Sequence, residues 1–507
     1  MPEDIEKNAA LAKGVGTAFL GRLGALVEVA ALPILAGLYG SETLGLFFTL
    51  WSAVRVSTTL SEFAMSTTLQ RFVPRTEDPR RAAGILKIAV LTSLLISTLL
   101  AVVFVILAPQ LAGIIHAGEA DQENLVTIIR VYAWVLPFWT LTEVLTASVR
   151  AHRRFGPEIR IRIFYEQGLR LVGAVVFYGL GFHSFGLFFA HLFSVAAAAF
   201  LACRLAAGFY DVKGLLRRRG EPGLAREMLS FAIMMTPANL IKKLNSDLPI
   251  LLLNQLLPGA AGAQAAAIYG IGRRVASLLQ VIRQSFEYVV APYASFRHAR
   301  AERQALSEMY AFTTRLISCL VLPIGVIVIL TRYDLLAPFS KDYQVAGGVI
   351  LILALGRIIE GLTGPSSALI EMMAGRLLPL INGLSGLTTL FVIQYWLTPE
   401  YGAVGAAVAA AAGLVVTAIL SLGEAWIFFR LQPYRLSLLR PLAVSSGATL
   451  LAGLVLPQIA KFGAPAGVAA GVAAVALSVF ALVRWGFEPR DVAALGRVGR
   501  IFSKSKV

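Results

Sequence analysis

The chain has 507 residues, of which 57% are hydrophobic and 15% are charged, whereas an average soluble domain carries about 25% charged residues. This composition excludes a soluble globular protein, a coiled coil and a disordered chain. The formal net charge of +16 would suggest a nucleic-acid partner for a soluble protein, but in a membrane protein the position of each charge matters more. We therefore expect no nucleic-acid partner.

Fourteen apolar segments follow one another along the chain, and each is long enough to cross a bilayer as a helix. Their abundance of Ala, Leu and Gly is typical of transmembrane helices. We therefore predict an all-α integral membrane protein with about 14 transmembrane helices. The predicted segments are 14–38, 43–70, 84–108, 125–149, 160–181, 184–208, 228–256, 264–291, 306–331, 345–370, 376–397, 402–429, 441–457 and 464–484.

Basic residues are distributed unevenly over the connections between these segments. One set of alternate connections, which includes both termini, holds 31 of the 45 basic residues, and Arg162 is counted in this set. The opposite connections hold only Arg130, Arg332, Lys341 and Lys461. By the positive-inside rule, both termini and the basic linker 209–227 are predicted to be cytoplasmic.

A short internal repeat divides the chain into two halves. The sequence LPIL at Leu32–Leu35 recurs at Leu248–Leu251, and a Gly-containing turn follows each copy. The next predicted helix then carries an arginine near its middle, Arg55 or Arg274. Six spans separate the copies, and because this number is even, the halves are predicted to be parallel repeats, an arrangement found in transporters that bind substrate between the halves.

The predicted organisation is two six-helix lobes followed by an extra helix pair. Gly463, Gly467 and Gly471 form two overlapping GxxxG spacings in the last span, which permit close helix packing. The predicted parts are a cytoplasmic N-terminus 1–13, an N-lobe 14–208, the linker 209–227, a C-lobe 228–430, the helix pair 431–484 and a basic cytoplasmic tail 485–507.

Four stretches resemble polysaccharide exporters, the Wzx-like flippases of the multidrug/oligosaccharidyl-lipid/polysaccharide (MOP) superfamily. Leu32–Phe47 resembles the first external turn of these proteins, and Ser61–Val73 resembles the small-residue segment that ends their second span. Ala147–Phe155 is similar to their loop after span 4, and Ala267–Ile271 to the start of their eighth span. The resemblance covers about residues 14–430, and its motifs are packing patterns without catalytic residues.

The resemblance implies a flippase for undecaprenyl-pyrophosphate-linked oligosaccharide, an O-antigen or exopolysaccharide repeat unit, in the bacterial cytoplasmic (inner) membrane. Such proteins have two lobes around a central cavity and work by alternating access. In the related lipid II flippases, an extra C-terminal helix pair forms a groove for the lipid tail. Membrane lipids are expected partners, a glycan polymerase and export machinery are candidate partners, and we expect a monomer.

Apart from the charges counted with the connections, ten basic and eight acidic residues fall inside the predicted spans, where a charge is costly unless it faces a polar cavity or a partner. Helical spacing predicts local ion pairs for some of them. These predicted pairs are Glu166–Arg170, Lys243–Asp247, Arg283–Glu287 and Arg357–Glu360. Structural ion pairing and substrate contact remain open for these residues.

The other interior charges are the candidate site. An anionic diphosphate or acidic sugar needs cations, and guanidinium binds phosphate in a bidentate manner. The candidates for substrate binding are Arg22, Arg55, Lys242, Arg273 and Arg274, with salt bridges between the lobes as the alternative role. Glu28, Glu62 and Asp247 are candidates for ion coupling or ion pairing.

Several functions are less compatible with the sequence. It contains no GxxxxGK[ST], HExxH or CxxC motif, so no attached ATPase, metal site or cofactor is predicted. No external connection is large enough for a catalytic domain, which argues against a glycan polymerase or any other enzyme. A lipid II-type flippase and a multidrug/cation antiporter of the same superfamily remain alternatives, although ten interior cations argue against the antiporter.

Overall fold

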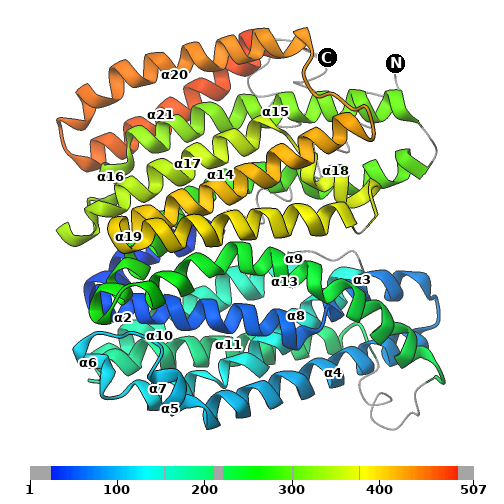
Figure 1. Cartoon of the computed structure of the whole chain (residues 1–507), viewed down its shortest axis with the longest axis vertical. Helices are drawn as coiled ribbons and strands as arrows, with labels where there is room; N and C mark the ends of the chain where they lie inside the picture. The colour runs from blue at the N-terminus through cyan, green and yellow to red at the C-terminus, as the bar shows by residue number, and fades with distance from the viewer. Residues whose placement is uncertain (1–23, 153–155, 211–220, 300–301, 376, 489–507) are drawn as a thin grey trace. The chain divides into compact units, whose positions relative to one another are not determined.

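All secondary structure in the described part of the chain is helical (Figure 1). The computed structural model describes residues 24–152, 156–210, 221–299, 302–375 and 377–488. By its internal contacts the chain divides into two compact units, which meet inside one long helix between Gly270 and Ile271.

The first unit, residues 24–270, contains the helices that follow the N-terminus. Several spans are broken into shorter pieces in this unit, as expected where Gly, Pro or polar residues interrupt a helix. The helices are α2 (Gly24–Glu62), α3 (Met65–Phe72), η1 (Val73–Arg75), α4 (Pro79–Ile106), α5 (Ala108–Ala112), α6 (Glu119–Gln122), α7 (Leu125–Tyr132), α8 (Val135–Ala151), α9 (Gly156–Ile159), η2 (Arg160–Tyr165), α10 (Glu166–Gly179), α11 (His183–Ala207), α13 (Leu224–Leu256) and the start of α14 (Gly259–Ala299).

The second unit contains the rest of α14 and the helices after it. Five of its described helical stretches are long and apolar enough to cross a membrane. They are α15 (Arg303–Leu330), α16 (Arg332–Leu336), η3 (Lys341–Val345), α17 (Ala346–Leu362), α18 (Ser366–Met373), α19 (Leu377–Ile427), η4 (Leu436–Leu438), α20 (Leu439–Ala460), α21 (Ala464–Ala481) and η5 (Leu482–Gly486).

The helices account for the fourteen predicted spans. Nine helical stretches in the described ranges are long and apolar enough to cross a membrane. Two of them, α2 and α19, are interrupted by a glycine with positive φ, Gly40 (φ 73°) and Gly402 (φ 52°), so that each contains two segments. The remaining three segments are α10 with the preceding η2, and the charged helices α13 and α14. The prediction of an all-helical, multi-pass membrane protein is therefore confirmed.

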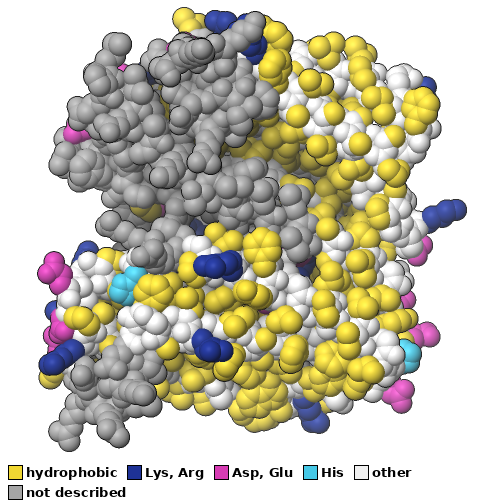
Figure 2. Space-filling view, turned by 180° about the vertical axis from the view of Figure 1, so that it is seen from behind, with side chains coloured by type: hydrophobic (Ala, Val, Ile, Leu, Met, Phe, Trp, Pro, Cys, Tyr) yellow, Lys and Arg dark blue, Asp and Glu magenta, His cyan; other side chains and the backbone are white. Residues whose placement is uncertain are grey.

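Apolar side chains cover much of the described surface, as expected for a protein whose solvent is lipid (Figure 2). On α4, Leu91, Leu95 and Leu99 lie at intervals of four residues and are each more than half exposed. Inside the first unit, α3, α4, α8, α11 and α13 share one hydrophobic core that contains Leu69 and Met228. The lipid-facing surface is as apolar as the core between the helices. The association of these helices therefore depends on side-chain fit more than on hydrophobicity.

Small residues determine how the last helix packs. A β-carbon at Gly467 would lie 2.2 Å from Asp334 of α16, and one at Gly471 would lie 3.0 Å from Thr331 at the end of α15. The glycines of the GxxxG spacing therefore permit α21 to pack closely against α15 and α16, as the sequence predicts. The hydroxyl of Ser445 in α20 donates to the backbone carbonyl of Cys319 in α15 (3.2 Å), which attaches the helix pair further.

Candidate functional site

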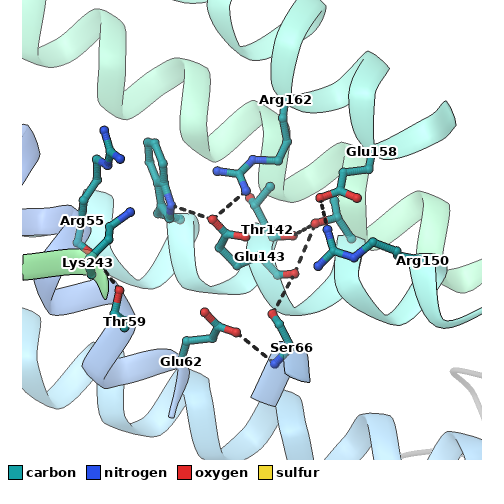
Figure 3. Close-up of polar contacts among 12 residues, drawn as sticks. Arg55, Thr59, Glu62, Ser66, Thr142, Glu143, Arg150, Glu158, Arg162 and Lys243 are labelled. Carbon is teal, nitrogen blue, oxygen red and sulfur yellow. Dashed lines mark hydrogen bonds and ion pairs between the residues drawn. The ribbon is translucent and has the colours of Figure 1, made fainter. Parts of the chain in front are cut away.

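Charged side chains from α2 and α13 meet within the first unit (Figure 3). The Nε atom of Arg55 lies 3.5 Å from Oδ2 of Asp247, and Nζ of Lys243 lies 3.8 Å from the same oxygen. The Asp247 side chain is fully buried, whereas 27% of each cationic side chain is exposed. Two cations thus converge on one carboxylate, and this trio has a net positive charge.

A second ion pair joins α8 to the start of the fifth span. Nη1 of Arg162 lies 2.6 Å from Oε1 of Glu143, and the indole Nε1 of Trp139 donates to the same oxygen at 3.3 Å. The Arg162 guanidinium carbon lies 5.3 Å from the Trp139 ring centre. Arg162 belongs to the π-helix η2, a backbone irregularity of a kind that often occurs at functional sites because it changes the direction of a side chain.

Glu62 ends α2 at a break inside the second span. Phe63 and Ala64 both have a φ of 51°, an uncommon value for residues other than glycine. The Glu62 carboxylate accepts a hydrogen bond from the backbone N–H of Ser66 at the start of α3 (2.9 Å). The Ser93 hydroxyl donates to the Glu62 backbone carbonyl at 3.0 Å. Glu62 therefore stabilises the start of the next helix, a structural role that accompanies any role in ion coupling.

The second unit has a charge network of its own in α14 and α17. Arg283 contacts both Glu287 (2.7 Å) and Glu360, and Arg357 contacts Glu360 at 2.8 Å. Arg357 also donates to the side-chain oxygen of Gln280 at 2.8 Å. Two arginines and two glutamates balance one another in this network. Removal of one partner would leave a buried charge uncompensated and would therefore destabilise the protein strongly.

The structure confirms several predicted local pairs and adds partners that lie far apart in the sequence. Contacts within one helix are present for Lys243–Asp247, Arg283–Glu287 and Arg357–Glu360. Glu166 and Arg170 are both buried in α10 and attract one another, and the Arg170 guanidinium lies 4.6 Å from the Trp51 ring centre. Helical spacing could reveal the pairs within one helix but not the contacts between helices.

The other predicted site residues are distributed over the chain. Arg22 lies outside the described residues, Glu28 is half-buried near the start of α2, and Lys242 is exposed on α13. Arg273 and Arg274 are half-buried on α14 in the second unit, just beyond the boundary at Gly270. Within the first unit, the structure brings together two of the predicted site residues, Arg55 and Asp247.

Arg162 and Glu143 are not among the predicted site residues. The sequence predicts a cytoplasmic connection for Arg162, but the structure pairs it with Glu143. The signal in the sequence is Glu143 itself, an acid inside a predicted span with no cation three or four residues away. In the described ranges, no group of three or more His, Cys, Asp or Glu side chains could hold a metal ion.

Comparison with known sequences identifies the family. The family described as polysaccharide biosynthesis protein matches residues 34–339, more than half of the chain. The chain belongs to this family. No curated protein matches it significantly.

Solved structures show which fold this polysaccharide biosynthesis protein has. The lipid II flippase MurJ in an inward closed conformation has a TM-score of 0.65 and 12% identity, with 93% of this chain and 98% of that chain covered. An inward-facing multidrug resistance MATE family transporter of the MOP superfamily has a TM-score of 0.61 and 16% identity, with coverage of 83% and 94%. A MOP superfamily transporter from Pyrococcus furiosus has the same score and identity, with coverage of 83% and 96%. The family member therefore has the MOP transporter fold.

Proposed function

We propose that this protein is a flippase, which moves undecaprenyl-pyrophosphate-linked oligosaccharide across the bacterial cytoplasmic membrane by alternating access. The membership in a polysaccharide biosynthesis family supports a glycan substrate. The observation that carries the proposal is the partial exposure of Arg55 and Lys243 inside a membrane-spanning region. A cation in that position is costly unless it faces a polar space, and a pyrophosphate is a suitable ligand for such a space.

The proposed binding residues are cationic. Arg55, Lys242, Arg273 and Arg274, together with Arg22, are the candidates for contact with the anionic headgroup. Asp247 holds Arg55 and Lys243 in position, since it is fully buried between them. Glu28, Glu62 and Asp247 are the candidates for ion coupling.

The proposed topology follows from the charge distribution. Both termini and the linker 209–227 are cytoplasmic, and the lobes are residues 14–208 and 228–430, with 431–484 as an extra helix pair. Membrane lipids surround the protein, a glycan polymerase and export machinery are its candidate partners, and we propose a monomer that transports its substrate without catalysing a reaction.

A lipid II-type flippase is the second candidate. The observation in its favour is that the likeness to MurJ extends over 93% of this chain, whereas the likeness to the MATE transporter covers 83%. The two functions differ in the glycan rather than in the lipid pyrophosphate. The identity of the lipid-linked glycan that accumulates in depleted cells separates them.

Depletion of the protein tests the proposal. Lipid-linked oligosaccharide should then accumulate in the cytoplasmic leaflet, and the exported glycan should decrease. Complementation with Arg55→Lys should restore export in part, because charge is retained without the guanidinium fork, whereas Arg55→Ala should restore little. Arg81→Ala is the matched control, because it removes an arginine from an exposed ion pair with Glu221 (3.3 Å). Normal export by an Arg55→Ala variant that inserts normally would refute the role of Arg55.

A further inference from the structure

The ion pair of Arg162 and Glu143 has features that a purely structural salt bridge does not need. Glu143 lies in a helical stretch that is long and apolar enough to cross a membrane, and Arg162 lies at the start of the predicted fifth span. Yet 22% of the Arg162 side chain and 24% of the Glu143 side chain are exposed. Figure 3 draws the pair together with Arg55 and Lys243. The pair is therefore only partly enclosed by the packing of the first unit.

The backbone around Arg162 is irregular. The π-helix η2 spans Arg160–Tyr165 and places the guanidinium beside Glu143 of α8. Wider helical turns of this kind are rare and are frequently found at functional sites. The contact with the Trp139 ring restrains the guanidinium further, because a cation is attracted to the face of an indole.

Glu143 has a second partner that does not depend on Arg162. The Trp139 indole N–H donates to Oε1 of Glu143 within one turn of α8. Lys243 and Arg150 also attract the Glu143 carboxylate, while Glu158 and Glu166 attract Arg162. Each member of the pair thus retains favourable interactions when the other is withdrawn, which lowers the cost of opening the pair.

We propose that Arg162 is a further anion-binding residue and that Glu143 is its exchangeable counter-ion. A phosphate group of the substrate displaces the Glu143 carboxylate and accepts the two parallel hydrogen bonds that a guanidinium can donate. Glu143 then remains bonded to Trp139 and close to Lys243. This inference rests on the proposed function. It adds Arg162 to the cationic site around Arg55 and makes Glu143 the residue that sets the affinity for the anion.

The exchange predicts how substitutions change anion affinity. Glu143→Gln keeps the acceptor oxygen for Trp139 but removes the competing charge. The purified variant should therefore bind inorganic pyrophosphate more tightly than wild type, on the order of tenfold, which corresponds to about 1.4 kcal/mol. Arg162→Ala should weaken binding by a similar factor, and Arg162→Lys should lie between it and wild type. The measurement is isothermal titration calorimetry in detergent at one pH and one salt concentration.

Two further comparisons make the test specific. Glu221→Gln, which removes a carboxylate from the exposed pair with Arg81, is the control and should bind pyrophosphate as wild type does. Vesicles that contain undecaprenyl pyrophosphate should compete with pyrophosphate if the lipid headgroup is the natural ligand; without such competition, the site binds free phosphate compounds instead.

The outcomes separate this inference from the proposed function. Equal pyrophosphate affinity of wild type and Glu143→Gln, or no binding by either, would overturn the exchange even if cells export glycan normally. Tighter binding by Glu143→Gln in a protein whose depletion leaves lipid-linked oligosaccharide unchanged would support the exchange and refute the proposed substrate.

Discussion

Gly45 packs closely against another backbone in the first unit and gives a sharp test of this packing. Gly45 lies in the second segment of α2, and a β-carbon built there would lie 1.7 Å from the carbonyl oxygen of Ala263 in the first turns of α14. To restore an ordinary contact of 3.4 Å, the two backbones must separate by about 1.7 Å. Gly45→Ala therefore cannot be accommodated by a side-chain movement, and overpacking of this kind costs about 1–3 kcal/mol.

Gly37 provides the matched control in the same helix. It is exposed, and a β-carbon there would have no neighbour within 4 Å, so Gly37→Ala should leave stability unchanged or raise it slightly through helix propensity. We expect Gly45→Ala to lower the melting temperature of the detergent-purified protein by several degrees. The melting temperature is measured by fluorescence-detected size-exclusion chromatography of heated samples. Equal melting temperatures for both variants would show that α2 and α14 do not pack as closely as the structure describes.

Three further predictions concern other parts of the chain. In a cysteine-free background, Ala120→Cys should react with an impermeant thiol reagent in intact cells, whereas Ala225→Cys should not; the reverse result would contradict the predicted orientation. Asn254 exchanges two hydrogen bonds with the backbone of His116 (2.9 and 2.6 Å), so Asn254→Ala should speed hydrogen exchange around residue 116, and unchanged exchange would refute the contact. Partial burial lowers the pKa of His152, so its stabilising contribution is complete above its unfolded-state pKa of about 6.5 and is lost as pH falls through its lower folded-state pKa; the melting temperature should decrease less on acidification in His152→Gln than in wild type.

The spans and their breaks were largely predictable because both depend on local chemistry. Long apolar runs form helices in lipid, where every backbone polar group must be paired within the segment. The turn at Gly40 was also visible, since the sequence places a glycine where the chain reverses between two apolar runs. The break at Phe63 and Ala64 was not visible, because neither residue favours a positive φ; contacts from other helices, such as Ser93 to the Glu62 carbonyl, stabilise it.

The site was predictable only where partners share a helix. The i,i+4 spacing gave the contact between Lys243 and Asp247, but nothing in the local sequence of α2 indicates that Arg55 reaches the same carboxylate from a helix almost two hundred residues away. The position of an intramembrane charge is therefore readable from sequence, whereas its partner is not. This is why the sequence left ion pairing and substrate contact open as roles for these cations.

The environment of Arg162 helps to distinguish ion pairing from substrate contact. The basic residues around it made a cytoplasmic connection the simplest assignment. The structure instead places Arg162 in a π-helix, an irregularity common at functional sites, and pairs it with Glu143 of α8. A salt bridge that only held α8 against the start of the fifth span would be most stable when fully buried. The side chains of Arg162 and Glu143 are instead 22% and 24% exposed. An irregular backbone that presents a paired but accessible arginine is better explained by exchange with an anionic ligand than by stability alone.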